Sequence, residues 1–195
     1  MKEKNAVSTA AIDIEQLEKE LERERFRVSR RTLAIGLMCA LAVIALLITT
    51  AVHLLPVYRI HGSSMSPTVE AGDVIVCAAG SSYDVGDIVA LEYDGRILVK
   101  RLVAREGDQV MIDEKGILHV NGNPVDEPYV SNRTSGRDTA TAIYTVPSGE
   151  WYILGDNRAI SGDSRLAEMG SIEDHCIIGR VIFRLLPIGG AGTIE

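Results

Sequence analysis

Three stretches of this sequence could take part in catalysis, and the first is a serine-rich segment at residues 61–68. It reads HGSSMSPT and contains Ser63, Ser64 and Ser66. A serine hydroxyl is a weak nucleophile until a neighbouring base removes its proton. The segment therefore predicts either a nucleophile with a base beside it or an ordinary polar loop. The choice depends on the bases that the rest of the chain provides.

Histidine is the usual base for a serine, and the candidates are His61, His119 and His175. His119 alternates with apolar residues beside a turn, and His175 lies next to acids in a pattern typical of a short helical turn. His61 precedes Ser64 by three residues, and residues three apart in an extended segment point to opposite faces. The sequence favours a structural or surface role for each histidine.

Lysine is the other candidate base, and from residue 59 onward the chain contains only Lys100 and Lys115. Lys115 lies at a predicted hairpin tip, where we expect it to be hydrated and charged. On a strand, Lys100 would share one face with Leu98 and Leu102. Burial among aliphatic side chains disfavours the charged amine and lowers its pKa from the free value of about 10.4. The strand pattern alone leaves open whether Lys100 is such a base or extends its amine to water or to an acid.

The third stretch, LGDNRAISGDSR at residues 154–165, alternates acids and arginines among turn-forming residues. An exposed loop could have this composition, but so could a loop held by charge-assisted hydrogen bonds. A hydroxyl from such a loop could orient a lysine amine without charging it. The polar residues concerned are Asp156, Asn157, Arg158, Ser161, Asp163, Ser164 and Arg165.

A long apolar run precedes all three stretches, because residues 32–58 contain no Asp, Glu, Lys or Arg. A helix of about 20 residues crosses the hydrocarbon core of a bilayer, whereas the apolar region of a cleavable signal peptide has only about 7–15. We therefore expect a permanent anchor. The basic stretch RERFRVSRR comes directly before it, which places the N-terminus in the cytoplasm. The predicted parts are a cytoplasmic charged segment at 1–31, a transmembrane anchor at 32–56 and an extracytoplasmic β-rich catalytic domain at 57–195.

After residue 58 the pattern changes to short runs rich in branched aliphatic residues, with turn residues between them. Such runs predict β-strands. They lie at residues 73–78, 87–93, 96–106, 109–113, 117–121, 150–155 and 176–186. Asp94-Gly95 and residues 113–116 are typical of hairpin turns, and residues 131–142 predict an exposed loop. The expected fold is mainly β, with an antiparallel β external domain preceded by one transmembrane helix.

Composition excludes some classes of protein. From residue 56 onward the chain has 12 Lys and Arg against 20 Asp and Glu, a net charge of −8, which argues against a nucleic-acid partner. Cys39 lies in the apolar run. Cys77 and Cys176 lie in predicted strands and could either form a disulfide or stay buried as single thiols. The spacing of the cysteines does not resemble a metal site, and no cofactor is expected.

Taken together, the three stretches resemble the conserved boxes of bacterial type I signal peptidases, which are Ser–Lys proteases. The boxes are GSSMSPT, VKRLVAREGD and GDNRAISGDSR, and they occur in the family's order after an N-terminal anchor. NGNPVDEPY, VPSGEWYILGDNR and IIGRVIFRLLPI also fit the family. The resemblance extends from Leu33 to Ile188, and all boxes in sequence are far more specific than any one of them.

The resemblance implies that Ser64 is the nucleophile, that Lys100 is the general base and that Ser161 holds the lysine amine in place. The backbone N–H of Ser64 would donate to the oxyanion. Many relatives add a serine hydroxyl two residues before the nucleophile, where this chain has Gly62. The second oxyanion donor is therefore left open.

The resemblance also implies that four charged residues support the site. We expect Asp156 to pair with Arg101 and Asp163 to pair with Arg165.

The implied partners are the lipid bilayer of the plasma membrane and preprotein signal peptides at its outer face. Chain length agrees, because the nine residues from Leu55 to Ser64 can span at most about 30 Å, which tethers Ser64 near the membrane. Two alternatives stay open. One is an anchored, non-catalytic β-domain that binds peptides or cell-wall components, and the other is a Ser–His hydrolase. Oligomeric state is not predicted.

Overall fold

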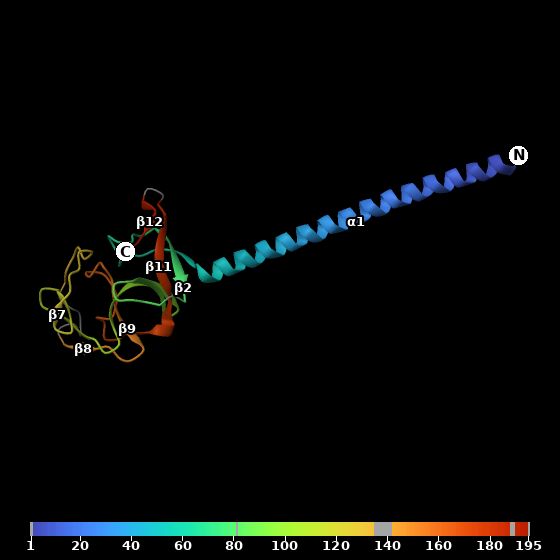
Figure 1. Ribbon diagram of the computed structural model, residues 1–195. Coiled ribbons are helices and arrows are strands. Elements are labelled where there is room, and N and C mark those ends of the chain that lie inside the picture. The colour runs from blue at the N-terminus through green and yellow to red at the C-terminus, as the bar shows by residue number, and fades with distance from the viewer. Residues whose placement is uncertain (1, 81, 135–141, 188–189, 195) are drawn as a thin grey trace. The chain divides into compact units, whose positions relative to one another are not determined.

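A computed structural model describes residues 2–80, 82–134, 142–187 and 190–194 of the chain (Figure 1). The chain divides into two compact units, Met1–Ala51 and Val52–Glu195.

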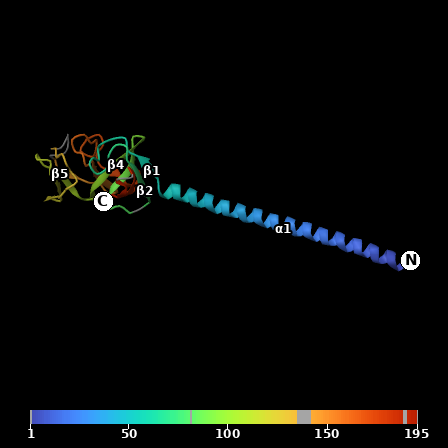
Figure 2. The ribbon, with the colours of Figure 1, turned by 90° about the horizontal axis from the view of Figure 1, so that it is seen from above.

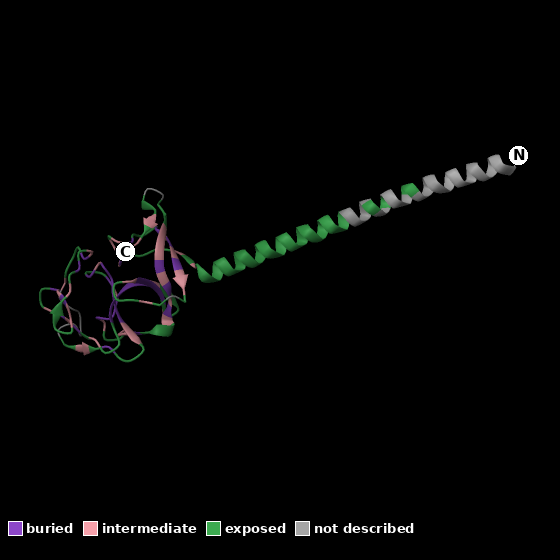
Figure 3. Cartoon of the chain, in the orientation of Figure 1, coloured by how far each residue is buried: buried purple, intermediate pink, exposed green. Residues whose placement is uncertain are grey.

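The N-terminal helix α1 runs from Lys2 to Leu54. Its part from Arg30 to Leu54 has a mean hydropathy of 2.6 and is, by length and composition, able to cross a membrane. Side chains along this part are exposed, as the green colour in Figure 3 shows. The helix ends two residues before Pro56, because a proline disfavours helical geometry at the residue before it.

The larger sheet of the second unit is antiparallel and has the strand order β1-β2-β11-β3-β4-β9-β10, with β12 paired to β11. Its long strands β4 and β11 each have ten residues. The strands of this sheet are β1 (Val57–Arg59), β2 (Val74–Ala79), β3 (Ile88–Tyr93), β4 (Arg96–Arg105), β9 (Glu150–Leu154), β10 (Ile172–Glu173), β11 (Ile177–Leu186) and β12 (Gly192–Thr193).

The smaller sheet is also antiparallel and has the order β7-β6-β5-β8. In both ribbon views its strands lie at the end of the unit that is farther from β2 (Figures 1 and 2). Its strands are β5 (Gln109–Ile112), β6 (Leu118–Val120), β7 (Asn123–Pro124) and β8 (Tyr144–Thr145).

Three clusters of buried side chains form the core of the unit, and strand β4 contributes to all of them. Val99 packs with Met65 under the segment that contains Ser64. Leu102 packs on the other side of β4, where Leu98 is also in contact. Val103 joins the cluster shared with the smaller sheet. Strand β4 therefore links the core under the serine segment to the core of the smaller sheet.

The prediction of a mainly antiparallel β fold is confirmed. Each of the seven predicted strands is present, and the Asp94-Gly95 turn joins β3 to β4 with both residues at positive φ. The helical turn expected at His175 is the 3-10 helix η1 (Asp174–Cys176). The short strands β1, β7, β8, β10 and β12 were not predicted, because two or three residues carry too little periodicity to read. The loop expected at 131–142 lies partly outside the described residues, since 135–141 are not described.

Candidate active site

Ser64 lies in a segment whose two ends, at Ile60 and at residues 72–73, are hydrogen-bonded to each other. Ile60 donates its N–H to the carbonyl of Asp73 at 2.8 Å, and Gly72 donates to the carbonyl of Ile60 at 2.8 Å. Between these bonds, the side chains of Met65 and Val69 are buried in the core. Ser64 therefore directly precedes the buried Met65 and is itself half-buried.

Lys100 is on strand β4 at the point where the pairing of that strand changes. Residues 96–101 of β4 pair with β3, whereas pairing with β9 starts only at Arg101. As predicted, the alternation of β4 places Leu98 and Leu102 in one cluster on the Lys100 face. The side chain is 2% exposed, and its Nζ lies 2.8 Å from Oγ of Ser64 as a hydrogen-bond donor. The sheet thus brings together two residues that are 36 positions apart.

Burial lowers the pKa of the Lys100 amine from its ordinary value. The carboxylates of Asp163 and Asp156 act in the opposite direction and the guanidinium of Arg165 reinforces the lowering, but desolvation is the largest influence. An amine in apolar surroundings is easier to deprotonate because its charged form loses hydration. The Lys100 environment therefore favours a neutral amine that could accept a proton from the adjacent hydroxyl.

The loop at 155–165 packs against the backbone of the serine segment. Asn157 donates its N–H to the carbonyl of Ser64 at 2.9 Å, and its side-chain amide donates to the carbonyl of Ser63 at 3.3 Å. A Cβ added at Gly155 would lie 2.5 Å from the Ser64 oxygen and 2.6 Å from the Ser161 Cβ. Only glycine allows this approach, so Gly155 is a part of the site that sequence reasoning did not single out.

The Ser161 side chain is 1% exposed, and its Oγ has no hydrogen-bond partner among the described residues. It lies next to Gly155, which in turn contacts Ser64. No bond between its hydroxyl and the Lys100 amine is formed in the described part of the chain. The predicted role of Ser161 in orienting that amine stays a prediction.

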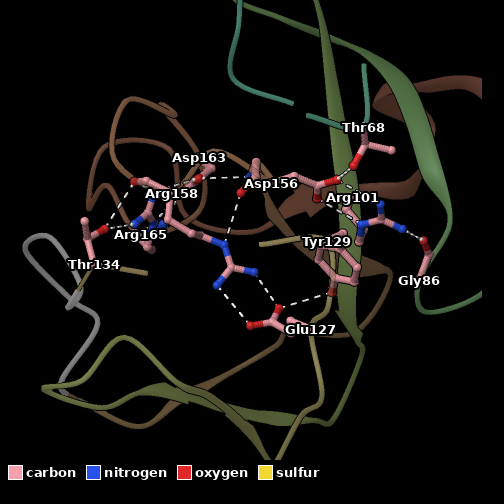
Figure 4. Close-up of polar contacts among 11 residues, drawn as sticks. Thr68, Gly86, Arg101, Glu127, Tyr129, Thr134, Asp156, Arg158, Asp163 and Arg165 are labelled. Carbon is pink, nitrogen blue, oxygen red and sulfur yellow. Dashed lines mark hydrogen bonds and ion pairs between the residues drawn. The ribbon is translucent and has the colours of Figure 1, made fainter. Parts of the chain in front are cut away.

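The two ion pairs that were expected around the site are present (Figure 4). Arg101 donates two hydrogen bonds to the carboxylate of Asp156, at 3.0 Å from Nε and 2.8 Å from Nη2. Arg165 donates from Nε to Asp163 at 2.7 Å. All four side chains are nearly inaccessible to solvent. Bidentate pairs of this kind fix geometry as well as charge, which makes the 155–165 loop rigid.

A groove of about 540 Å³ begins at Ser64 and Lys100. One wall is formed by residues 57–62 and the other by residues 96–100 of β4. A second hollow of about 340 Å³ also begins at Ser64 and Lys100, and Tyr93 and Met169 help to line it. Ser64 and Lys100 are therefore accessible to a ligand from both hollows.

The sequence matches a family model described as "Signal peptidase, peptidase S26" over residues 30–186. The chain belongs to the signal peptidase family. A signal peptidase I of Bacillus caldolyticus is 35% identical over 147 residues, which cover 67% of this chain and 79% of that relative. Signal peptidase I U of Bacillus subtilis is 30% identical over 172 residues, covering 82% and 91%. A crystal structure of a signal peptidase I from Enterococcus faecalis has a TM-score of 0.43 and 26% identity, and the match covers 51% of this chain and 97% of that one.

The three candidate histidines of this signal peptidase family member are placed away from a role as base for Ser64. His119 lies 3.3 Å from the carboxylate of Asp113, and His175 lies 3.0 Å from Glu173 at the surface. His61 is exposed on the wall of the groove. Within the described residues none of them is hydrogen-bonded to Ser64, which agrees with the surface or structural roles that the sequence favours.

The cysteines of this family member do not pair. Cys39, Cys77 and Cys176 are all free, so the disulfide that the sequence left open is not formed. The described residues contain no group of three or more His, Cys, Asp or Glu side chains arranged to hold a metal ion.

Gly62 is the position at which the sequence leaves the second oxyanion donor open. A Cβ added there would meet nothing within 4 Å. The site therefore has room for a larger side chain beside Ser64, although this chain uses glycine.

Two further groups of this family member's site were not predicted. Thr68 donates its hydroxyl to Asp156, which links the serine segment to the Arg101 pair. Glu127 pairs with Arg158, with both side chains almost fully buried. Nothing in the local sequence separates Glu127 from the acids that lie at the surface, because its partner is 31 residues away. The tertiary structure alone identifies it.

Proposed function

We propose that this protein is a membrane-anchored serine endopeptidase that removes signal peptides from exported preproteins by means of a Ser64–Lys100 dyad. The observation that carries the proposal is the 2.8 Å contact between the Lys100 amine and the Ser64 hydroxyl. A buried lysine amine that contacts a serine hydroxyl, and has no ion pair among the described residues, is suited to serve as its base. Membership of the signal peptidase family supports the same chemistry.

The proposed reaction begins with Lys100 in its neutral form. The amine accepts the Ser64 proton while Oγ attacks the scissile carbonyl, and the negative charge on the carbonyl oxygen is stabilised by the Ser64 N–H. The protonated amine then gives its proton to the departing amine of the mature protein, which leaves an acyl-enzyme. Lys100 next removes a proton from water, the hydroxide attacks the ester, and Ser64 regains its proton. No metal or cofactor enters this cycle.

The surrounding residues have supporting roles in this proposal. Ser161 orients the Lys100 amine through its hydroxyl. The Arg101–Asp156 pair holds the strand position next to Lys100, and the Asp163–Arg165 pair holds the loop that carries Ser161. The loop also supplies the Asn157 bond to the Ser64 carbonyl.

The groove explains how a polypeptide substrate would bind. Residues 96–100 of β4 pair with β3 on one side, and within the described residues no strand pairs with their other edge. An extended peptide can add to such an edge through its backbone. This mode accepts many sequences, which suits an enzyme that processes many preproteins with small residues at the cut.

The anchor gives the enzyme its location in this proposal. Residues 1–31 would lie in the cytoplasm, 32–56 would cross the plasma membrane once, and the β-rich domain at 57–195 would lie outside. The apolar part of α1 supports this arrangement, as does the basic stretch before it.

Substitution tests the proposal directly. Purified full-length protein in detergent is incubated with a preprotein, and the cut is mapped by mass spectrometry. Ser64→Ala and Lys100→Ala should each abolish cleavage, whereas a variant with His61, His119 and His175 all changed to Gln should retain it. Cleavage that survives Lys100→Ala would exclude the dyad, and loss of cleavage in the histidine variant would favour a Ser–His hydrolase.

A further inference from the structure

The ion pair between Glu127 and Arg158 is the most deeply buried in the described part of the domain that the proposed mechanism does not use. The side chains are 0% and 1% exposed. Both carboxylate oxygens of Glu127 accept from the guanidinium, with Nη1 at 3.2 Å from Oε2. Figure 4 shows the guanidinium and the carboxylate facing each other end to end. In the chain Glu127 lies between strands β7 and β8 of the smaller sheet, whereas Arg158 belongs to the loop at 155–165.

A gain in folding stability does not by itself explain a buried ion pair. Two charges lose their hydration on burial, and apolar residues of similar volume often stabilise a protein as well or better. Buried pairs are better explained when they fix one geometry among several.

Arg158 connects the pair to the backbone next to the nucleophile. Its Nε donates to the carbonyl of Gly155 at 3.1 Å. Gly155 is in close contact with the Ser64 carbonyl, which also accepts the Asn157 N–H at 2.9 Å. A shift of the Arg158 guanidinium would therefore move Gly155, which packs against the backbone of Ser64.

Residues 127–129 also contact Arg101, which lies next to Lys100 on β4. The hydroxyl of Tyr129 donates to Glu127 at 3.2 Å, and the Tyr129 ring lies 3.9 Å beneath the guanidinium of Arg101. Arg101 follows Lys100 on β4 and pairs with Asp156. A cation above an aromatic face is attracted to it. Residues 127–129 thus touch one arginine beside the base and one arginine of the loop beside the nucleophile (Figure 4).

We propose that Glu127 is a positioning residue for the reaction, and that it sets the placement of Ser64 relative to Lys100 by acting through Arg158 and the Gly155 carbonyl. The inference rests on the proposed Ser–Lys function. It predicts a loss in the chemical step with little change in substrate binding, because the groove walls at 57–62 and 96–100 contain neither residue.

The main test separates positioning from stability. Glu127→Ala leaves the buried Arg158 guanidinium without its carboxylate, so both the melting temperature and kcat should fall. The double variant Glu127→Leu/Arg158→Met replaces the pair with apolar groups and should regain most of the melting temperature. It still lacks the bond to Gly155, so kcat should stay roughly tenfold to 100-fold low while KM for the preprotein is unchanged. Recovery of kcat together with the melting temperature would overturn the proposal.

A conservative variant keeps the test decisive if the double variant does not fold. Glu127→Asp retains the charge but shortens the side chain by one methylene, so the guanidinium must move toward it. We expect kcat and kcat/KM to fall by the same factor, as they do when an interaction specific to the transition state is lost. Wild-type kcat in Glu127→Asp would overturn the proposal.

Two controls complete the design. Arg180→Met breaks another arginine–carboxylate pair, with Asp87 at 3.6 Å on the larger sheet, and should leave kcat unchanged. Ser64→Ala in the same assay separates the two proposals. If Ser64→Ala still cleaves, the dyad is wrong. If Ser64→Ala is inactive and the Glu127 variants have wild-type kcat, only the positioning role is wrong.

Discussion

Gly155→Ala is the substitution whose effect on catalysis follows most directly from the structure. The added methyl group would lie 2.5 Å from the Ser64 carbonyl oxygen and 2.6 Å from the Ser161 Cβ, and closer still to the Ser161 Oγ. Non-bonded carbon atoms in contact have an optimal separation of about 3.5–4.0 Å. Either the serine segment or the loop at 155–165 must therefore move by roughly 1 Å.

The size of the effect follows from that displacement. A misplacement of about 1 Å in a reacting group can cost about 100-fold in rate, which corresponds to about 2.7 kcal/mol in activation free energy. Overpacking would also lower the free energy of unfolding, by about 1–3 kcal/mol. We therefore expect Gly155→Ala to fold less stably and to have a kcat about 100-fold below that of the wild type.

The assay is preprotein cleavage by full-length enzyme in detergent, with the folded fraction determined by near-UV circular dichroism. Gly179→Ala is the matched control, since a Cβ there would lie 2.5 Å from the Ala78 carbonyl oxygen, between β11 and β2. It should lower stability without lowering kcat per folded molecule. The reasoning is refuted if Gly155→Ala has wild-type kcat per folded molecule, or if the two variants lose kcat equally.

Three further predictions concern protonation, support and oxyanion binding. Because burial lowers the pKa of Lys100, kcat/KM should rise with pH as the amine loses its proton and should then level off; a pH–rate profile that is flat down to about pH 5 would contradict this. Asp156→Asn leaves Arg101 buried without its carboxylate, so denaturant unfolding should show a loss of about 3–5 kcal/mol, and unchanged stability would disprove the role of the pair. Gly62→Ser fits open space and should raise kcat by up to about 100-fold if its hydroxyl reaches the oxyanion; single-turnover rates equal to wild type would show that it does not.

Much of the fold could be predicted from the sequence because strand periodicity and turn chemistry are local signals. Branched aliphatic runs such as residues 87–93 and 96–106 predicted the strands, and Asp94-Gly95 predicted the turn between them. The face shared by Leu98, Lys100 and Leu102 also followed from alternation alone. Short strands such as β10 (Ile172–Glu173) escaped prediction, because their pairing with β9 is decided by distant residues.

The site could be predicted only in part. Ser64 and Lys100 are recognisable from their boxes, and the pairing of Asp163 with Arg165 spans two residues. By contrast, the partner of Arg158 could not be read from the chain, because Glu127 looks like any other acid near a turn. The role of Gly155 could not be predicted either. A glycine after a strand predicts a turn, but the close approach of the Ser64 backbone is visible only in the structure.

By itself, the sequence determined which groups are available to this protein: an apolar helix, alternating strands, one lysine among aliphatic residues and a serine before a methionine. These properties depend on neighbours within a few positions, so the chain encodes them locally. The tertiary structure decided that the Lys100 amine lies 2.8 Å from Ser64 and that Glu127 pairs with Arg158 in the buried interior. Such contacts depend on how separate strands and loops pack, and packing is a property of the whole domain rather than of any one segment.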